Sequence, residues 1–183
     1  MTDIEKQISA IILNKALKNL QSNPLSNINC SVGLVDKDNI YNWKCVLTGP
    51  NDSPYKGGFF KFIMKFPYDF PKHAPEIIFK TPILHLNVNP KETQNQALGH
   101  CCLSTINNWN PQTSIEDILM SIFGLFYANN PNSPFLGYGT DVINEFQNDK
   151  DAYNERVKYF TKKYADGLYT ETNTTRWDFT YNK

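Results

Sequence analysis

The sequence lacks a run of roughly eighteen apolar residues, so no segment is predicted to span a membrane. It also lacks an excess of either charge, because 18 Lys and Arg residues balance 18 Asp and Glu residues. General binding of nucleic acid needs a basic surface, and like charges form no long run in this chain. We therefore expect neither a membrane nor a nucleic acid as partner.

The first twenty residues do not have the pattern of a secretory signal. Such a signal starts with basic residues and continues into a solid apolar segment, whereas Asp3 and Glu5 come early here. An amphipathic helix explains the segment better. We expect a cytoplasmic or nuclear protein, monomeric, with a single core of the size that 183 residues allow.

Cysteine is scarce, with four residues and no C-x-x-C pair. Cys30 and Cys45 lie in alternating apolar runs, which favours buried structural thiols. The adjacent pair Cys101 and Cys102 lies in a turn-rich segment, where a thiol is more accessible to reaction. A buried pair of thiols is the alternative.

Two other chemistries could use this pair of thiols. Together with His85 and His100 they could supply zinc ligands, but adjacent cysteines rarely both bind the metal. A cysteine protease would use His85 as the base and Asn87 to orient it. In those families, however, the histidine follows the nucleophile at a distance, whereas here it precedes it. No metal is expected.

The pattern of apolar residues predicts an α+β fold in two layers. Thr2 and Glu5 have capping-box spacing for a first helix that ends at 23–24. Its apolar positions are Ile4, Ile8, Ile11, Ile12, Leu13, Leu17 and Leu20. Four strands are then expected in an antiparallel meander, over residues 28–35, 40–47, 59–66 and 76–80.

Helical spacing returns in the last third of the chain. Thr113 and Glu116 predict another capping box, opening a helix that runs to a stop at 129–131. Two more helices are predicted over 140–148 and 151–165. The residues after Gly167 are polar with alternating aromatics, which fits either a docked strand or a loose end.

Residues 81–111 show no regular period. About thirty residues without regular structure inside a domain are usually functional. This segment holds His85, Asn87, His100, Cys101 and Cys102, so we expect the site here.

Several ordered motifs resemble the ubiquitin-conjugating family. The run NIYNWKCVLTGPNDSPYKGGFFKFIMKFPYDFP resembles its N-x-x-x-W, G-P, P-Y-x-G-G-x-F and F-P-x-x-Y-P pattern. ILHLNV resembles its H-P-N segment, and GHCCLSTINNWNP resembles its G-x-x-C-L and W-x-P segments. SIEDILMSIFGLF, NNPNSPF and FTKKYA resemble its later helix, the stop of that helix and the end of its core. Matches in this order are specific to the family.

The resemblance implies a conjugating core over residues 1–166, with an N-terminal helix, a four-stranded sheet and C-terminal helices, followed by an extension over 167–183. It implies that Cys102 accepts ubiquitin, or a related modifier, as a thioester and passes it to a substrate lysine. Cys101 would be a small apolar residue of the core. No cofactor is expected on this chain, since ATP would be used by the upstream activating enzyme.

The resemblance also gives roles to residues around Cys102. Asn87 would donate to the oxyanion formed during attack or support the loop, and His85 would hold the loop by hydrogen bonds. Ser133 falls where the family often has an acidic or hydroxyl residue that orients the incoming lysine. Ser104 matches a position that is often acidic, and a solvated serine is the alternative there.

Partner surfaces follow from the same resemblance. Lys6, Lys15 and Lys18 would contact the activating enzyme. A ligase would use the first helix together with Lys72 and the loop Asn110, Pro111 and Gln112. Ser31 resembles a position where some members bind a second ubiquitin. A conjugating enzyme for another ubiquitin-like modifier, or a non-catalytic ubiquitin-binding module, remains open.

The chain departs from the family pattern at four places. Leu86 replaces the motif proline, so we expect a less rigid loop. Residues 90–98 form an apparent insertion before the active cysteine. Ala74 replaces one proline of a pair, and Lys72 stands where some members carry an aromatic residue that contacts ligases.

Overall fold

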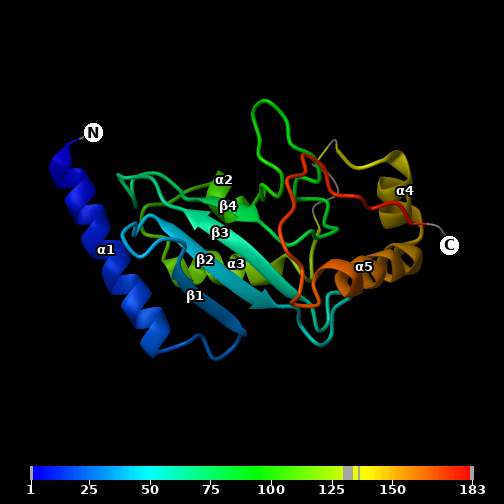
Figure 1. The fold of residues 1–183 in the computed structure, drawn as a ribbon, viewed down its shortest axis with the longest axis horizontal. Helices are drawn as coiled ribbons and strands as arrows, with labels where there is room; N and C mark the ends of the chain where they lie inside the picture. The colour runs from blue at the N-terminus through cyan, green and yellow to red at the C-terminus, as the bar shows by residue number, and fades with distance from the viewer. Residues whose placement is uncertain (1, 130–133, 136, 182–183) are drawn as a thin grey trace.

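A four-stranded antiparallel sheet forms the centre of the structure, in the order β1-β2-β3-β4 (Figure 1). The computed structural model describes residues 2–129, 134–135 and 137–181. The strands are β1 (Cys30–Leu34), β2 (Asn42–Thr48), β3 (Phe59–Lys65) and β4 (Glu76–Phe79). The helices are α1 (Asp3–Ser22), α2 (Ser104–Asn107), α3 (Ile115–Gly124), α4 (Thr140–Asn148) and α5 (Lys150–Tyr164). The predicted α+β meander is confirmed.

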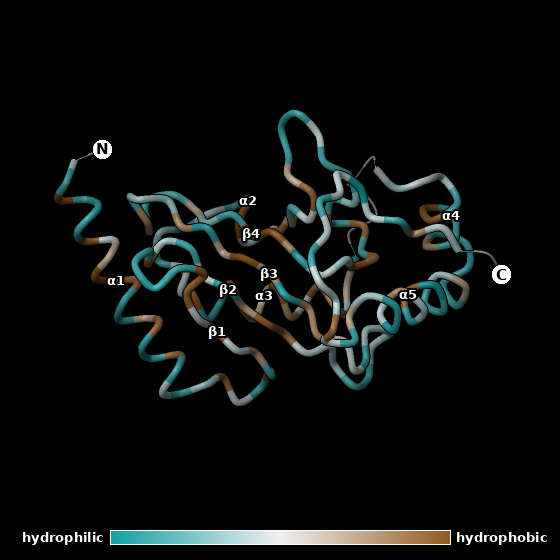
Figure 2. The backbone as a smooth tube through the Cα atoms, viewed as in Figure 1, coloured by the Kyte–Doolittle hydropathy of each residue, from teal (hydrophilic) through white to brown (hydrophobic). Residues whose placement is uncertain are grey.

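The two central strands, β2 and β3, alternate between buried and more exposed positions, as half-buried strands do. Trp43, Cys45 and Leu47 of β2 are buried, and they pair with Met64, Phe62 and Phe60 of β3, which are buried too. Figure 2 shows the apolar residues concentrated along these central strands. Cys45 is a core thiol as predicted, while Cys30 is half-buried.

Helix α1 lies at one end of the sheet, and α4 and α5 lie at the other (Figure 1). The predicted capping box of Thr2 and Glu5 is present in α1, and the helix ends at Asn23. The helix predicted from the spacing of its apolar residues is present, but Ile4, Ile8 and Ile11 are exposed. The core side of α1 begins later, and its buried residues are Ser9, Leu13, Leu17 and Leu20.

Helix α3 crosses the sheet, and its buried residues belong to the same hydrophobic core (Figure 1). Its capping box is formed by Ser114 and Asp117. The prediction of Thr113 and Glu116 was therefore wrong by one residue. Ser114 Oγ accepts a hydrogen bond from Asp117 N at 3.0 Å, and Asp117 Oδ2 accepts one from Ser114 N at 3.1 Å. The spacing was right, but Ser114 has the extended backbone that an N-cap needs.

The last two helices pack against each other around a buried arginine. Asp149 ends α4 and caps α5 by accepting from Ala152 N at 3.0 Å. Arg156 of α5 is 4 % exposed and pairs with Asp141 at 2.7 Å and Glu145 at 3.1 Å. Both helices lie within one or two residues of their predicted bounds.

Residues 165–181 form neither a strand nor a free end. From the end of α5 the segment passes beside the 90–98 loop and ends near α4 (Figure 1). Its residues Trp177 and Phe179 are buried. The Phe179 ring packs on Phe160 of α5, with centroids 5.0 Å apart, and stacks on Tyr138 at 6.1 Å. The segment is thus docked by its aromatic side chains, and it adds to the core. Among the described residues, no helix is both long and apolar enough to cross a bilayer.

Candidate active site

The two adjacent cysteines lie on a short antiparallel pairing outside the main sheet. Val88 pairs with Cys101, Cys102 N donates to Asn87 O at 2.9 Å, and Asn89 N donates to His100 O at 2.8 Å. Successive side chains of such a pairing point to opposite sides. Val88 and Cys101 point into the core, at 0 % and 2 % exposure. Cys102 therefore points outward, beside Asn87.

The environments of the two thiols differ accordingly. Burial raises the pKa of the Cys101 thiol well above its usual value, and the nearby Cys102 adds to this effect. Cys101 is thus a core residue, as predicted. The Cys102 side chain is half-buried, and its Sγ accepts a hydrogen bond from Asn107 Nδ2 at 3.1 Å. An amide donor in this position interacts favourably with negative charge on sulfur.

Asn107 reaches the sulfur because α2 follows Cys102 directly. This one-turn helix lies in the segment that was expected to lack regular structure, so that expectation was wrong here. Its last residue folds back on Cys102, five positions earlier in the chain. The sequence carried no clear signal for it, because its N-cap is Leu103 without a side-chain hydrogen bond, and four residues are too short to show a period.

Cys102 lines two hollows that open on either side of it. The first contains Asn87, Asn107, Ser104 and the exposed side of the chain after α3. The second lies between the 90–98 insertion and the residues Pro134, Phe135 and Gly137, and it contains Lys91 and Glu92. The sulfur is therefore reachable from solvent along both sides.

His85 is fully buried, and its imidazole forms hydrogen bonds with main-chain groups. Its Nε2 faces Leu125 O at 2.9 Å and Ala128 O at 3.3 Å, and its Nδ1 accepts from Asn87 N at 3.1 Å. A ring that donates from Nε2 and accepts at Nδ1 is neutral. Burial lowers the pKa of His85 to about 4, against the opposing effect of the two carbonyls. His85 holds the loop, and it is not placed as the base of a protease.

Leu86 does not leave the loop loose, contrary to expectation. A leucine has the N–H that proline lacks, and Leu86 N donates to Asn129 Oδ1 at 2.9 Å. Its carbonyl accepts from Phe135 N at 2.9 Å. The loop is therefore fixed by hydrogen bonds where the motif would use a ring.

A second anchor of this loop is Tyr138, which sequence reasoning missed. Its hydroxyl accepts from His85 N at 3.2 Å and faces the carbonyls of His85 at 2.9 Å and Val88 at 3.1 Å. Tyr55 OH donates to Leu84 O at 2.8 Å from the other side. Burial raises the pKa of both phenols well above the usual value, so they remain protonated donors. The residues that precede Asn87 are thus held from several directions.

Asn87 itself is 5 % exposed and lines the first hollow with Cys102. Ser104 lies at the start of α2 and lines the same hollow. The predicted Ser133 lies outside the described residues. No group of three or more His, Cys, Asp or Glu suited to a metal occurs in the part of the chain that the structure describes.

The comparison with known families agrees with this geometry. Residues 12–161 match the family model described as ubiquitin-conjugating enzyme. The chain belongs to the ubiquitin-conjugating enzyme family. The matched range includes the four strands and helices α2, α3 and α4, together with parts of α1 and α5, and it contains Cys102.

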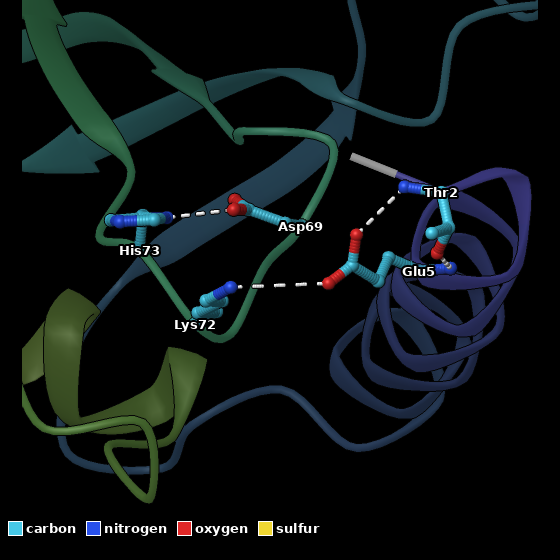
Figure 3. A network of polar contacts seen from close by, with 5 residues as sticks. All are labelled: Thr2, Glu5, Asp69, Lys72 and His73. Carbon is cyan, nitrogen blue, oxygen red and sulfur yellow. Dashed lines mark hydrogen bonds and ion pairs between the residues drawn. The ribbon is translucent and has the colours of Figure 1, made fainter.

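The predicted partner residues of this conjugating-enzyme family member fall into two groups. Lys72 lies beside the first turn of α1, where its Nζ is 3.9 Å from Glu5, and His73 pairs with Asp69 at 2.7 Å on the same loop (Figure 3). Lys6 lies over the Tyr68 ring at 4.5 Å. The structure therefore joins the loop 68–73 to the start of α1.

The second loop joins the same face through Trp109. Its Nε1 donates to Pro71 O at 2.8 Å, and its ring lies 5.9 Å from Phe70. The exposed residues that follow it are Asn110, Pro111 and Gln112. Further along α1, Lys15 and Lys18 are exposed, and Ser31 is exposed on β1. In the described part of the chain, Lys15, Lys18 and Ser31 do not line either hollow that contains Cys102.

Proposed function

We propose that this protein accepts ubiquitin, or a related modifier, as a thioester on Cys102 and transfers it to a lysine of a substrate. The observation that carries the proposal is the opposite orientation of two adjacent sulfurs. Cys101 is buried, while Cys102 points outward, receives an amide donor from Asn107 and lines two hollows. A thiol with access on both sides suits a carrier that must receive and then release an acyl group.

The chemistry needs little besides this sulfur. A thiol is already nucleophilic near neutral pH, so exchange from the thioester of an activating enzyme requires no dedicated base. The neutral, main-chain-bonded His85 agrees with this reaction. ATP would be consumed by the activating enzyme, and no cofactor is needed on this chain.

Transfer to a lysine is the harder step. Attack of the amine on the thioester carbonyl places negative charge on the carbonyl oxygen, which an amide N–H can stabilise. Asn87 lies opposite Cys102 in the pairing and lines the same hollow. We assign it this role, with His85, Tyr138 and Asn129 holding its backbone.

The surfaces for the ligase and the activating enzyme are proposed from where the exposed residues of α1 and the neighbouring loops lie. A ligase would bind the face formed by the start of α1, Lys72 and the loop of Asn110, Pro111 and Gln112, which Trp109 joins to Pro71. Lys6, Lys15 and Lys18 would receive the activating enzyme on the exposed side of α1.

The first test is charging of the purified protein by activating enzyme, ATP and each candidate modifier. A reductant-sensitive adduct is expected with the wild type and with Cys101→Ser. Cys102→Ser should give a reductant-resistant ester or no adduct. Charging that survives Cys102→Ser as a thioester, and is lost in Cys101→Ser, would assign the reaction to the other sulfur.

The second test separates the charging of Cys102 from the transfer of the modifier to lysine. Asn87→Ala should still be charged, but discharge to free lysine should fall about a hundred- to a thousandfold, the usual effect of removing one oxyanion donor. The control is Asn110→Ala, an exposed loop amide outside both hollows. Equal discharge rates for wild type and Asn87→Ala would remove Asn87 from the chemistry.

A further inference from the structure

The side chain of Asn107 contacts the reactive sulfur directly. Its Nδ2 donates a hydrogen bond to Cys102 Sγ at 3.1 Å. Among the described residues, no other side chain donates to this sulfur. No sequence pattern assigned a role to Asn107, because the contact depends on the one-turn helix α2 folding back on the residue that precedes it.

The backbone that carries Asn107 is anchored. Asn107 N donates to Leu103 O at 2.9 Å within α2, and the Leu103 side chain is buried in the core. The hydroxyls of Thr105 and Ser121 lie 2.7 Å apart and join α2 to α3. The amide is therefore presented to the sulfur by fixed main chain, and only its own side-chain torsions remain to be positioned.

The first hollow offers the sulfur no charged partner. Its lining consists of amides, hydroxyls, a glycine and apolar side chains, and none of the described residues in it is Lys, Arg, Asp or Glu. Negative charge that forms on Cys102 is therefore stabilised on this side by neutral donors. A hydrogen bond to an ionised acceptor is stronger than one between neutral groups, so the Asn107 amide stabilises the sulfur most when the sulfur is charged.

From this contact we propose that Asn107 is a catalytic residue, which stabilises the Cys102 sulfur as the leaving group in transfer to lysine. The proposal rests on the proposed function, since it needs a thioester on Cys102. The lysine amine attacks the carbonyl carbon and loses a proton to solvent. The C–N bond forms, and the C–S bond breaks with its electron pair left on sulfur. The Asn107 amide donates a hydrogen bond to this thiolate and keeps its proton, and the thiolate afterwards takes a proton from solvent.

The two asparagines then act on different atoms of the reacting group. Asn87 is assigned to the carbonyl oxygen, whose negative charge is largest in the tetrahedral intermediate. Asn107 bonds to the sulfur, whose negative charge grows as that intermediate collapses. Attack and departure of the leaving group are thus supported from the loop before Cys102 and from the helix after it.

The loss of this amide should affect discharge more than charging. During transfer the bound modifier covers the sulfur, so water cannot replace the amide, and the hydrogen bond is stronger where water is excluded. During charging, the same hydrogen bond increases the amount of thiolate but makes each thiolate less nucleophilic. These two effects oppose each other.

The experiment measures discharge to free lysine after activating enzyme and ATP have been removed. Asn107→Ala should slow discharge about tenfold, while charging changes less. Asn107→Asp should slow discharge at least as much, because its side chain has nearly the same shape but places a carboxylate where the donor was. Asn108→Ala is the matched control. This neighbouring amide lines the same hollow without bonding to the sulfur, and its variant should discharge at the wild-type rate.

A second measurement uses the uncharged protein, so it does not depend on any modifier. Thiolate is read from its ultraviolet absorbance at about pH 8.5, where an ordinary cysteine is about half ionised, as the difference from Cys102→Ser. Burial raises the pKa of the other three cysteine thiols, so they contribute little at this pH. Both Asn107 variants should contain less Cys102 thiolate than the wild type, and Asn108→Ala should match it.

Four results would overturn the proposal while leaving the proposed function intact. They are wild-type discharge in Asn107→Ala, wild-type discharge in Asn107→Asp, an equal loss of discharge in Asn108→Ala, and unchanged thiolate in uncharged Asn107→Ala. Absence of any thioester on the wild type would instead defeat the proposed function, and the leaving-group role of Asn107 with it.

Discussion

The central sheet and the active-site segment are both buried, yet different forces hold them. In β2 and β3 the main-chain groups pair with each other, and the side chains only need to be apolar and of suitable size. Residues 83–88 have no long ladder, so their main-chain groups need partners from elsewhere. Tyr55, Tyr138, Asn129 and His85 supply them. Substitutions in the sheet should therefore change stability alone. Substitutions of the residues that hold the active-site segment should change both stability and the rate of transfer to lysine.

The largest expected effect is on the sheet side of this comparison. Phe62 is 1 % exposed and packs on Phe79 of β4 with ring centroids 5.5 Å apart. Phe62→Ala should lower the free energy of unfolding by about 3–5 kcal/mol. Urea denaturation measures this, and Phe59→Ala on the exposed side of β3 is the control. At a temperature where the variant is folded, its discharge rate per charged molecule should match the wild type, and a rate loss beyond tenfold would break the comparison.

The buried imidazole predicts a pH dependence of stability. Burial lowers the pKa of His85 from its ordinary 6.5 to about 4. Between these two pH values the unfolded chain binds a proton at this ring and the folded chain does not. Stability should be complete above about pH 6.5 and fall as the pH drops toward 4, by about 3 kcal/mol in total.

Carboxylates also titrate in this window, so the measurement is a difference. Stability against pH is compared between the wild type and His85→Gln, with His73→Gln as the control on an exposed histidine. The His85 variant should show a shallower fall between these pH values. Parallel curves for the wild type and His85→Gln would show that the buried ring does not remain neutral.

The smallest expected change in stability belongs to a single hydroxyl. Tyr138→Phe removes the oxygen that bonds to His85 and Val88, at a cost of about 1–3 kcal/mol. Unlike the sheet variant, it should also slow discharge to free lysine, because the backbone on either side of Asn87 loses an anchor.

Tyr164→Phe is the matched control for this hydroxyl. It removes a comparable hydroxyl-to-carbonyl bond, from Tyr164 to Asp178, away from the active-site segment. Discharge should be unchanged there, and charging by the activating enzyme should be similar in both variants. Equal discharge rates for the two tyrosine variants would show that Tyr138 only adds stability.

The difference between local pairing in the sheet and distant partners at the active-site segment also explains what the sequence could predict. Local patterns specify the capping box of Thr2, the alternation in β2 and β3, and the bounds of α4, because each depends on neighbours a few residues apart. Where two overlapping patterns had equal spacing, as at 113–116 and 114–117, the sequence did not decide between them. The exposed residues Ile4, Ile8 and Ile11 have helical spacing without facing the core, since α1 extends past the sheet.

The support of the site was beyond prediction from the sequence. Tyr138 bonds to His85 across 53 positions, and Asn129 bonds to Leu86 across 43. No local period records such pairs. The motif located Cys102, Asn87 and His85, but the loss of its proline suggested a looser loop, whereas the leucine gained an N–H that Asn129 accepts. The sequence also did not decide how the C-terminal segment is placed. Its alternating residues resembled a strand, whereas the structure holds it by the packing of its aromatic side chains.

The most direct test of the central claim labels the two sulfurs without changing either. Charged protein is treated under denaturing conditions with one alkylating reagent to block free thiols, then with hydroxylamine to cleave thioesters, and then with a second alkylating reagent. We predict that the second label is found on Cys102 and the first on Cys101. The second label on Cys101, or on neither residue, would contradict the account.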